Sequence, residues 1–207
     1  MPQVFSRRAE LVVKLVLLGG ATFGAGLLAW AMSVERSFDP VGHPVAQPIP
    51  FSHKHHVGDD GLDCRYCHTT VETAAQAGMP STRICMGCHA QLYADAPVLQ
   101  PLRDSAANGQ PIAWRRVHVL PDFVYFHHGV HVAKGVACVE CHGPIDQMPL
   151  PWRTSRLEMQ WCVDCHRDPS SRRVPPGQVF AMTPSKGGEM PPLEHERRRT
   201  DCSTCHR

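Results

Sequence analysis

The sequence has no cysteine to spare and little of what an ordinary protein core needs. All ten cysteines of the 207 residues stand in one repeated pattern, so none is left over outside it. Aromatic residues make up only 7% of the chain, while 19 prolines and 16 glycines interrupt it. The formal net charge of +2 gives no indication of a nucleic-acid partner. Such a chain needs something other than its own side chains to fill its interior.

The repeated pattern is Cys-x-x-Cys-His, and it occurs five times. Each copy is an attachment signature for haem c, because two thiols bond to the two vinyl groups of one haem and the adjacent histidine reaches the iron. The sequence therefore predicts five covalently attached haem c groups. The predicted attachment residues are Cys64, Cys67, Cys85, Cys88, Cys138, Cys141, Cys162, Cys165, Cys202 and Cys205. The predicted proximal iron ligands are His68, His89, His142, His166 and His206.

Other uses of paired cysteines fit this pattern less well. A zinc ribbon needs four ligands for each metal ion and gives no reason for a histidine after every pair. A disulfide framework does not require one fixed spacing repeated five times. A thioredoxin-like redox pair needs a single motif on a βα unit, and no such pattern is visible.

The length of the chain sets the expected fold. About 170 residues follow the N-terminal segment, which is enough for one modest domain. Divided among five haems, they cannot build an ordinary core, so the haems must supply most of the apolar interior. We therefore expect a multihaem cytochrome c fold. Short α-helices at the attachment motifs and irregular coil would wrap around five haems, with little or no sheet.

The N-terminal segment predicts a membrane anchor. Residues 15–34 form an uncharged stretch of 20 residues, long enough to cross a bilayer as one helix. Arg7, Arg8 and Lys14 precede it, which favours a cytoplasmic N-terminus (residues 1–14) and places the haem region in the periplasm. This makes the chain a single-pass protein of the cytoplasmic membrane. A removed signal peptide is the alternative, because Ala29-Trp30-Ala31 is similar to a cleavage site.

The rest of the chain divides around an internal repeat. A Phe-x-His-x-x-His run precedes a pair of attachment motifs twice, at residues 51–89 and 126–166. Each is interpreted as a two-haem module. The remaining segments are a linker (35–50), a haem-free connection (90–125) and an extended arm that carries the fifth haem (167–207).

The Phe-x-His-x-x-His runs resemble those of the class III multihaem cytochromes, in which this motif supplies two distal iron ligands. The resemblance implies that the distal ligands of four haems are His53, His56, His128 and His131. His55 and His127 are adjacent alternatives. For the fifth haem we predict Met148, whose thioether would raise the reduction potential. Its alternatives are Met159, His118 and His195.

These ligands indicate an electron carrier that is not an enzyme on its own. An iron held on both sides transfers electrons without binding small substrates. The pentahaem nitrite reductases resemble one another in a Cys-x-x-Cys-Lys motif, which this chain lacks. Two other functions stay open: a self-sufficient multihaem quinol dehydrogenase and a terminal reductase with one five-coordinate haem.

Several longer segments carry a closer resemblance. They are residues 51–57, 64–72, 120–126, 141–144 and 161–167. All are similar to the membrane-anchored pentahaem cytochrome c subunit of alternative complex III. The resemblance implies a quinol-oxidising respiratory complex with an iron–sulfur subunit and polytopic membrane subunits. Electrons would pass through the haems to a periplasmic cytochrome c, a copper protein or an oxidase.

Overall fold

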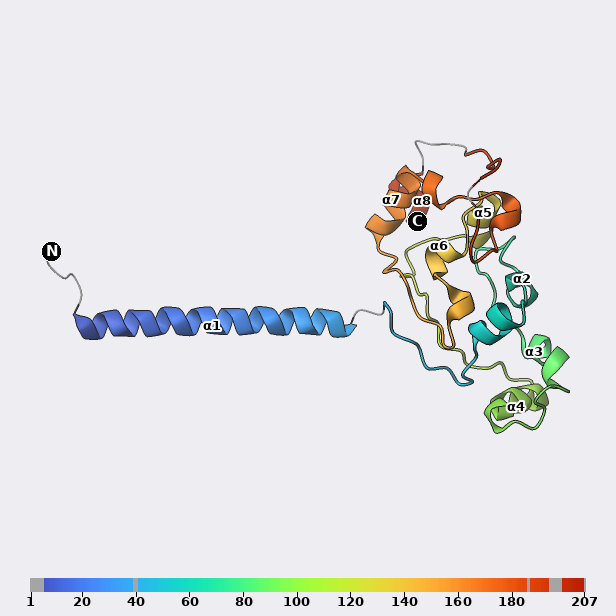
Figure 1. Cartoon of the computed structure of the whole chain (residues 1–207), viewed down its shortest axis with the longest axis horizontal. Helices are drawn as coiled ribbons and strands as arrows, with labels where there is room; N and C mark the ends of the chain where they lie inside the picture. Colours follow the sequence, from blue (N-terminus) through green and yellow to red (C-terminus); the bar gives the residue numbers. More distant parts are fainter. Residues whose placement is uncertain (1–5, 39–40, 186, 194–198, 207) are drawn as a thin grey trace. The chain divides into compact units, whose positions relative to one another are not determined.

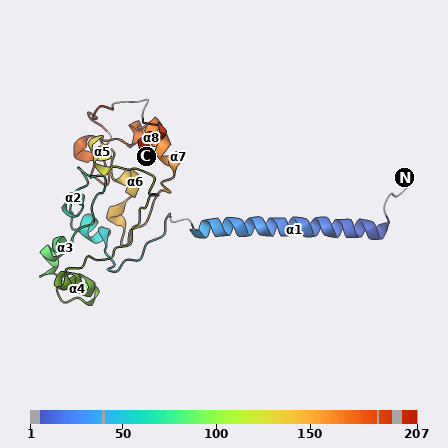
Figure 2. The same cartoon turned by 180° about the vertical axis from the view of Figure 1, so that it is seen from behind.

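The chain consists of two units, which are described separately. The computed structural model describes residues 6–38, 41–185, 187–193 and 199–206 (Figures 1 and 2). The first unit comprises Met1–Pro40 and the second Val41–Arg207.

The first unit is one long helix, α1 (Arg7–Phe38). Its stretch Arg7–Val34 has a mean hydropathy of 2.0 and is long and apolar enough to cross a membrane, although a signal sequence has the same properties. The helix begins eight residues before the predicted span, and an i,i+4 ion pair between Glu10 and Lys14 stabilises this charged first part. The prediction of one N-terminal apolar helix is therefore confirmed.

The second unit is built from short helical segments joined by irregular chain. In chain order they are η1 (Lys54–Asp59), α2 (Cys64–Cys67), α3 (Thr82–His89), η2 (Pro97–Leu99), α4 (Gln100–Asn108), α5 (His128–Ala133), α6 (Val139–His142), η3 (Ile145–Gln147), α7 (Met159–Arg167), η4 (Ser170–Arg172), η5 (Pro176–Gln178) and α8 (Cys202–Cys205). The described residues contain only isolated β-bridges and no strand. The predicted fold of short helices and coil is confirmed.

The helices of the second unit are spread between two ends. Figures 1 and 2 both show α3 and α4 at one end, α7 and α8 towards the other, and α2 and α6 between them. The N–H of Tyr125 donates to the Cys205 carbonyl at 2.7 Å, so the chain before α5 fixes the position of α8. Helix α4 lies within the predicted haem-free connection and packs against α3.

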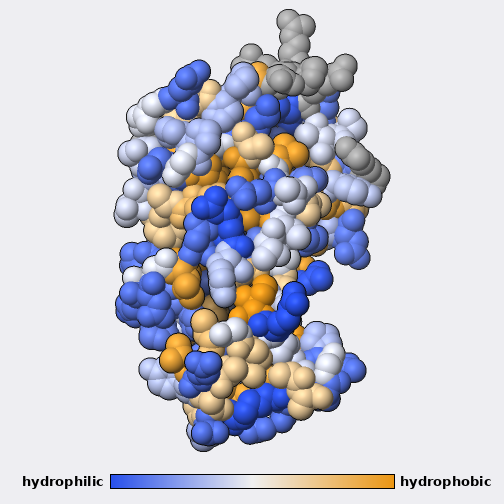
Figure 3. Space-filling view, turned by 90° about the vertical axis from the view of Figure 1, so that its right-hand side faces the viewer, coloured by the Kyte–Doolittle hydropathy of each residue, from blue (hydrophilic) through white to orange (hydrophobic). Residues whose placement is uncertain are grey.

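The apolar core of this unit is small. Its one buried cluster among the described residues consists of Ala137, Val174 and Val179. The N–H of Cys138 donates to the Val179 carbonyl at 3.0 Å, so the first part of the predicted arm packs against the second module. Several large apolar side chains, such as Tyr66 and Phe123, are exposed instead. Figure 3 shows apolar surface in the hollows of one face, where large apolar groups would cover it.

Replacing Val174 with alanine tests whether this cluster stabilises the second unit. Val174 is fully buried, so the Val174→Ala variant of the haem-loaded protein should lose about 2 kcal/mol in free energy of unfolding. Guanidinium unfolding followed by far-UV circular dichroism measures the loss. Val98, which is 51% exposed, provides the control, because Val98→Ala should change the stability by less than about 0.5 kcal/mol. Equal losses in both variants would contradict the assignment of the core.

Candidate functional site

Each attachment motif lies on or beside one turn of helix. We number them motif 1 (64–68), motif 2 (85–89), motif 3 (138–142), motif 4 (162–166) and motif 5 (202–206). The backbone N–H of the motif histidine donates to the carbonyl of the first cysteine at 2.9 Å in motifs 1 and 3 and at 2.8 Å in motif 5. A single turn places the two thiols, three residues apart, on one side and the histidine directly after them.

Four of the five attachment-motif histidines make the same kind of hydrogen bond. Their Nδ1 atoms contact backbone carbonyls: His68 with Gly78 at 2.7 Å, His89 with Leu92 at 3.0 Å, His166 with Arg199 at 2.7 Å and His206 with Phe123 at 3.3 Å. A carbonyl can only accept, so Nδ1 must carry the proton. The Nε2 lone pair is then free to bind a metal ion, which is the arrangement that orients ligating histidines in metalloproteins.

Three histidines of the two Phe-x-His-x-x-His runs have the same hydrogen bond. The Nδ1 of His56 donates to Ser52 O at 2.9 Å, that of His128 to Ala75 O at 2.8 Å and that of His131 to His127 O at 2.8 Å. Their Nε2 atoms are therefore also free. His56 comes from the π-helical turn η1, and the other two from α5.

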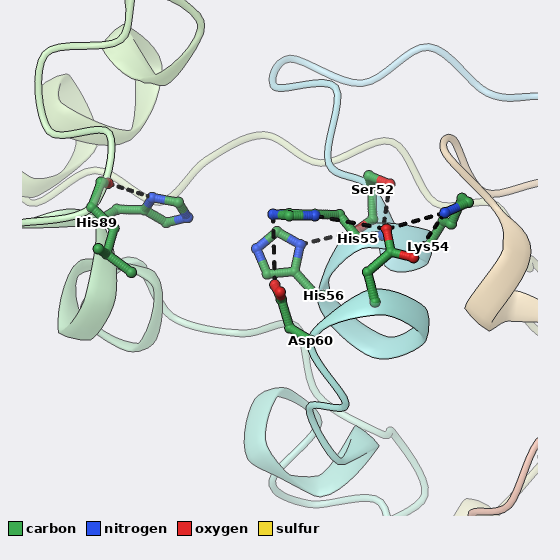
Figure 4. Close-up of polar contacts among 8 residues, drawn as sticks. Ser52, Lys54, His55, His56, Asp60 and His89 are labelled. Atoms are coloured by element: carbon green, nitrogen blue, oxygen red, sulfur yellow. Dashed lines mark hydrogen bonds and ion pairs between the residues drawn. The ribbon is translucent and has the colours of Figure 1, made fainter.

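His55 and His127, the neighbours of His56 and His128, make different contacts. The ring of His55 faces carboxylates, with Nε2 3.6 Å from Oδ2 of Asp60 (Figure 4). The Nδ1 of His127 accepts the Val130 N–H at 3.3 Å and caps α5. A neutral imidazole whose Nδ1 accepts carries its proton on Nε2 and cannot use that atom as a ligand. The geometry therefore separates His56 and His128 from their neighbours, which sequence reasoning alone could not do.

Three histidines of the Phe-x-His-x-x-His runs each face the ring of an attachment-motif histidine. The ring centres are 6.1 Å apart in His56–His89, 6.3 Å in His128–His142 and 6.1 Å in His131–His166. Figure 4 shows His56 pointing towards His89. Two imidazoles on opposite sides of one metal ion have ring centres about 6 Å apart, because each nitrogen lies about 2 Å from the metal. The residues present thus fit a haem iron held between two histidines.

The two modules repeat the same local packing. In the first module, the ring centres of His53 and His56 lie 4.9 and 4.5 Å from that of Phe51, at interplanar angles of 89° and 26°. In the second module, the corresponding histidines lie 4.7 and 4.4 Å from Phe126, at 89° and 27°. His53 therefore occupies the position in its module that His128 occupies in the second.

Several of these histidines are partly buried and neutral. Desolvation by burial lowers the pKa of His53 to about 4, and the nearby His68 and His56 lower it further. Burial likewise lowers the pKa of His142 to about 3. The Nδ1 of His53 is buried and has no hydrogen-bond partner among the described residues. Neutral imidazole is the form that binds a metal ion.

Of the candidates for the fifth distal ligand, His118 is also buried. Its ring centre lies 4.4 Å from that of His142, in motif 3, and its Nε2 has no hydrogen-bond partner among the described residues. This separation is shorter than that of the three facing pairs.

The remaining candidates lie apart from one another. Met148 is fully buried next to η1, where its carbonyl accepts the Lys54 N–H at 3.0 Å. Met159 is 68% exposed at the start of α7, and His195 lies outside the described residues. The His206 ring stacks on Phe123, with ring centres 5.8 Å apart. Met148 as the distal ligand of the fifth haem stays a prediction.

Comparison with known proteins decides the family. A family model for cytochrome c7 and related cytochrome c matches residues 49–108 and 124–207, which include all five motifs. The chain belongs to this family. It is thus a multihaem cytochrome c, and its five Cys-x-x-Cys pairs are consistent with five haems. His118 lies between the two matched segments.

One curated relative is similar to this cytochrome. The "Menaquinone reductase, multiheme cytochrome c subunit" of Nitratidesulfovibrio vulgaris is 38% identical over 123 residues, or 59% of this chain. The alignment spans about half of the relative's length, 52%. These comparisons support the multihaem family and do not specifically support alternative complex III.

Sequence reasoning missed the groups that orient the histidines. The acceptors are main-chain carbonyls, such as those of Gly78, Ala75 and Phe123, which no residue type marks. The one available signal is Gly129, where a Cβ would lie 2.7 Å from the Glu72 carbonyl oxygen. This glycine lets α5 approach the chain that follows motif 1.

Replacing Gly129 with alanine tests this close approach. The added methyl group must push α5 away from residues 72–75, so we expect the haem-loaded variant to lose about 1–3 kcal/mol in free energy of unfolding. Gly177→Ala is the control, because a Cβ there meets nothing within 4 Å. Chemical unfolding of both variants measures the difference, and an unchanged Gly129→Ala stability would show that α5 is not held against this segment.

Proposed function

We propose that this chain is the electron-carrying subunit of a membrane-bound respiratory complex. The observation that carries the proposal is the set of three facing histidine pairs at 6.1–6.3 Å. A pair of this kind leaves an iron no open position for a substrate. The chain would therefore pass electrons on and perform no bond-breaking reaction of its own.

The proposed axial pairs follow from the geometry and from the module repeat. Motif 2 would use His89 with His56, motif 3 would use His142 with His128, and motif 4 would use His166 with His131. Motif 1 would use His68 with His53, because His53 stands where His128 stands in the second module. Met148, which lies next to η1, stays the predicted fifth distal ligand, and we assign no partner to His206 of motif 5.

The protein's own part in this function is to hold and orient the ligands. When bound, haem supplies one-electron exchange at its iron. The carbonyl bonds to Nδ1 keep seven of the imidazoles in the ligating tautomer and increase their basicity. Burial keeps His53 and His142 neutral, as their lowered pKa values of about 4 and about 3 indicate. The ten cysteines would hold the haems covalently.

The respiratory setting is supported by two observations. One is α1, which is long and apolar enough to cross a membrane. We propose that it anchors the chain in the cytoplasmic membrane with the haem region in the periplasm. The other is the relative named as a subunit of menaquinone reductase. An iron–sulfur subunit, polytopic membrane subunits and a periplasmic redox partner are the proposed partners, and the quinone is the proposed ultimate donor or acceptor.

Two directions of electron flow are proposed for testing. The segments similar to alternative complex III favour quinol oxidation, whereas the name of the curated relative favours menaquinone reduction. Both require partner subunits. A self-sufficient quinol dehydrogenase would not.

Purification of the native complex from membranes tests this proposal. We expect an iron–sulfur subunit to copurify, and the complex to exchange electrons between the haems and a menaquinone or ubiquinone analogue. The chain purified alone should keep its haems and lose quinone activity. Quinol oxidation by the isolated chain would contradict the role of a carrier subunit and favour the self-sufficient dehydrogenase.

The histidine pair His55 and His56 provides a matched test of the ligands. His56→Ala should convert one of the five haems from low-spin to high-spin, because its iron loses a ligand. That iron should then take up carbon monoxide. Electron paramagnetic resonance of the oxidised protein and the carbon monoxide difference spectrum measure both effects. His55→Ala should leave all haems low-spin. A high-spin haem in His55→Ala, with none in His56→Ala, would show that His55 and not His56 is the ligand.

Met148→Leu tests the proposed fifth ligand, since leucine keeps most of the volume of the buried side chain. If the thioether binds iron, the variant should show one haem with a changed spin state and a lower reduction potential in a spectroelectrochemical titration. Five unchanged potentials would assign Met148 to packing next to η1.

A further inference from the structure

Hydrogen bonds and ring contacts join the attachment motifs of the second unit to one another. The Gly129 N–H donates to the Ala74 carbonyl at 3.1 Å, which holds the chain after motif 1 against α5, the helix that supplies His128 to motif 3. Phe51 packs on both His53, the proposed partner of motif 1, and His56, which faces His89 of motif 2, so motif 1 also lies beside motif 2. Motif 1 is therefore flanked by motif 2 on one side and by motif 3 on the other.

Motif 4 continues from motif 3. Burial raises the pKa of Cys141 to about 12, and the nearby Cys165 and Cys162 contribute to this rise. The histidines show the same neighbourhood, because α5 supplies His128 to the ring of His142 in motif 3 and His131 to the ring of His166 in motif 4. One helix therefore holds these two sites side by side.

Motif 5 lies beside motif 4. The Nδ1 of His166 donates to the Arg199 carbonyl at 2.7 Å, and the Arg199 Nε donates back to the His166 carbonyl at 3.1 Å. Arg199 stands three residues before Cys202. The chain that leads into motif 5 is thus tied to the histidine of motif 4.

The two outermost motifs carry the most accessible attachment residues. Cys88 in motif 2 and Cys202 in motif 5 are exposed, whereas the other eight cysteines are partly buried. Figures 1 and 2 show α3, which carries motif 2, at one end of the unit and α8, which carries motif 5, towards the other. Helices α2 and α6 lie between them.

We propose that the five haems form a single row in the order of motifs 2, 1, 3, 4 and 5, and that electrons enter and leave through motifs 2 and 5. This inference rests on the proposed electron-carrying function. The order differs from the order along the chain, because the first attachment motif occupies an interior position. The connection through residues 90–125 carries the chain from the motif 2 end back to the second module.

The structural arm of the test uses the haem-loaded protein without any substitution. Anomalous scattering at the iron edge locates the five irons in its crystals, and the polypeptide traced around them assigns each iron to its motif. We expect each of the three inner irons to have two near neighbours, in the stated order. An iron of motif 2 or 5 lying between two others would overturn the proposal, as would a ring or a branched cluster.

The functional arm uses charge changes at exposed positions beside the motifs. Two variants change the charge at the proposed ends: Arg83→Glu on α3 beside motif 2, and Ser203→Lys within motif 5. The matched control is Thr69→Glu, directly after the interior motif 1. Stopped-flow kinetics of the purified complex with its soluble redox partner measure the second-order rate constant at low ionic strength. We expect at least one end variant to change it three-fold or more, since charges at a contact surface mainly affect association. The control should change it less than two-fold.

The two arms separate the inference from the function on which it rests. If only Thr69→Glu altered the rate constant, electrons would be exchanged through an interior motif and the proposed ends would be wrong. If the irons lie in the stated order but the complex exchanges no electrons with a quinone, the row stands and the proposed respiratory function fails. If quinone-linked transfer occurs with a different order of irons, only the row fails.

Discussion

The hydrogen bond from a histidine Nδ1 to a main-chain carbonyl is the interaction on which the site depends. Seven histidines make it, four of them in attachment motifs and three in the Phe-x-His-x-x-His runs. Because a carbonyl cannot donate, the bond fixes the proton on Nδ1 and leaves Nε2 as the free ligand atom. Several acceptors, including Ala75, Phe123 and Arg199, lie far from their histidine in the sequence, so these bonds also tie separate segments together.

The same constraint explains why the polypeptide has so small a core. Short helices and irregular chain are sufficient when each needs only to present a ligand at a fixed height and orientation. Large apolar side chains such as Tyr66 and Phe123 remain exposed in the polypeptide, and the buried cluster around Val174 holds only the second module and the arm together. In the proposed function, the haems complete the interior, which couples folding to cofactor attachment in the manner of small metal-binding domains.

The attachment sites and the short helices could be predicted from the sequence, whereas the choice between adjacent histidines could not, for a physical reason. The spacing Cys-x-x-Cys-His is set by local covalent geometry, so five copies are sufficient to predict the cofactor and the short helices. The choice between His55 and His56, or between His127 and His128, depends on the direction of one side chain. That direction follows from a π-helical turn at η1 and from the cap of α5, neither of which the residue types determine. The burial of His118 beside His142 likewise brings together residues 24 positions apart.

The sequence by itself determined the family, the attachment residues and the apolar N-terminal helix, because each depends on a pattern of residues close together in the chain. Only the tertiary structure decided which histidines face one another and which motifs are neighbours. Motif 1 lies beside motif 3 because α5, which supplies His128 to motif 3, lies against residues 72–75, where Gly129 has no side chain to obstruct the approach. Contacts between distant segments depend on packing that no local pattern records.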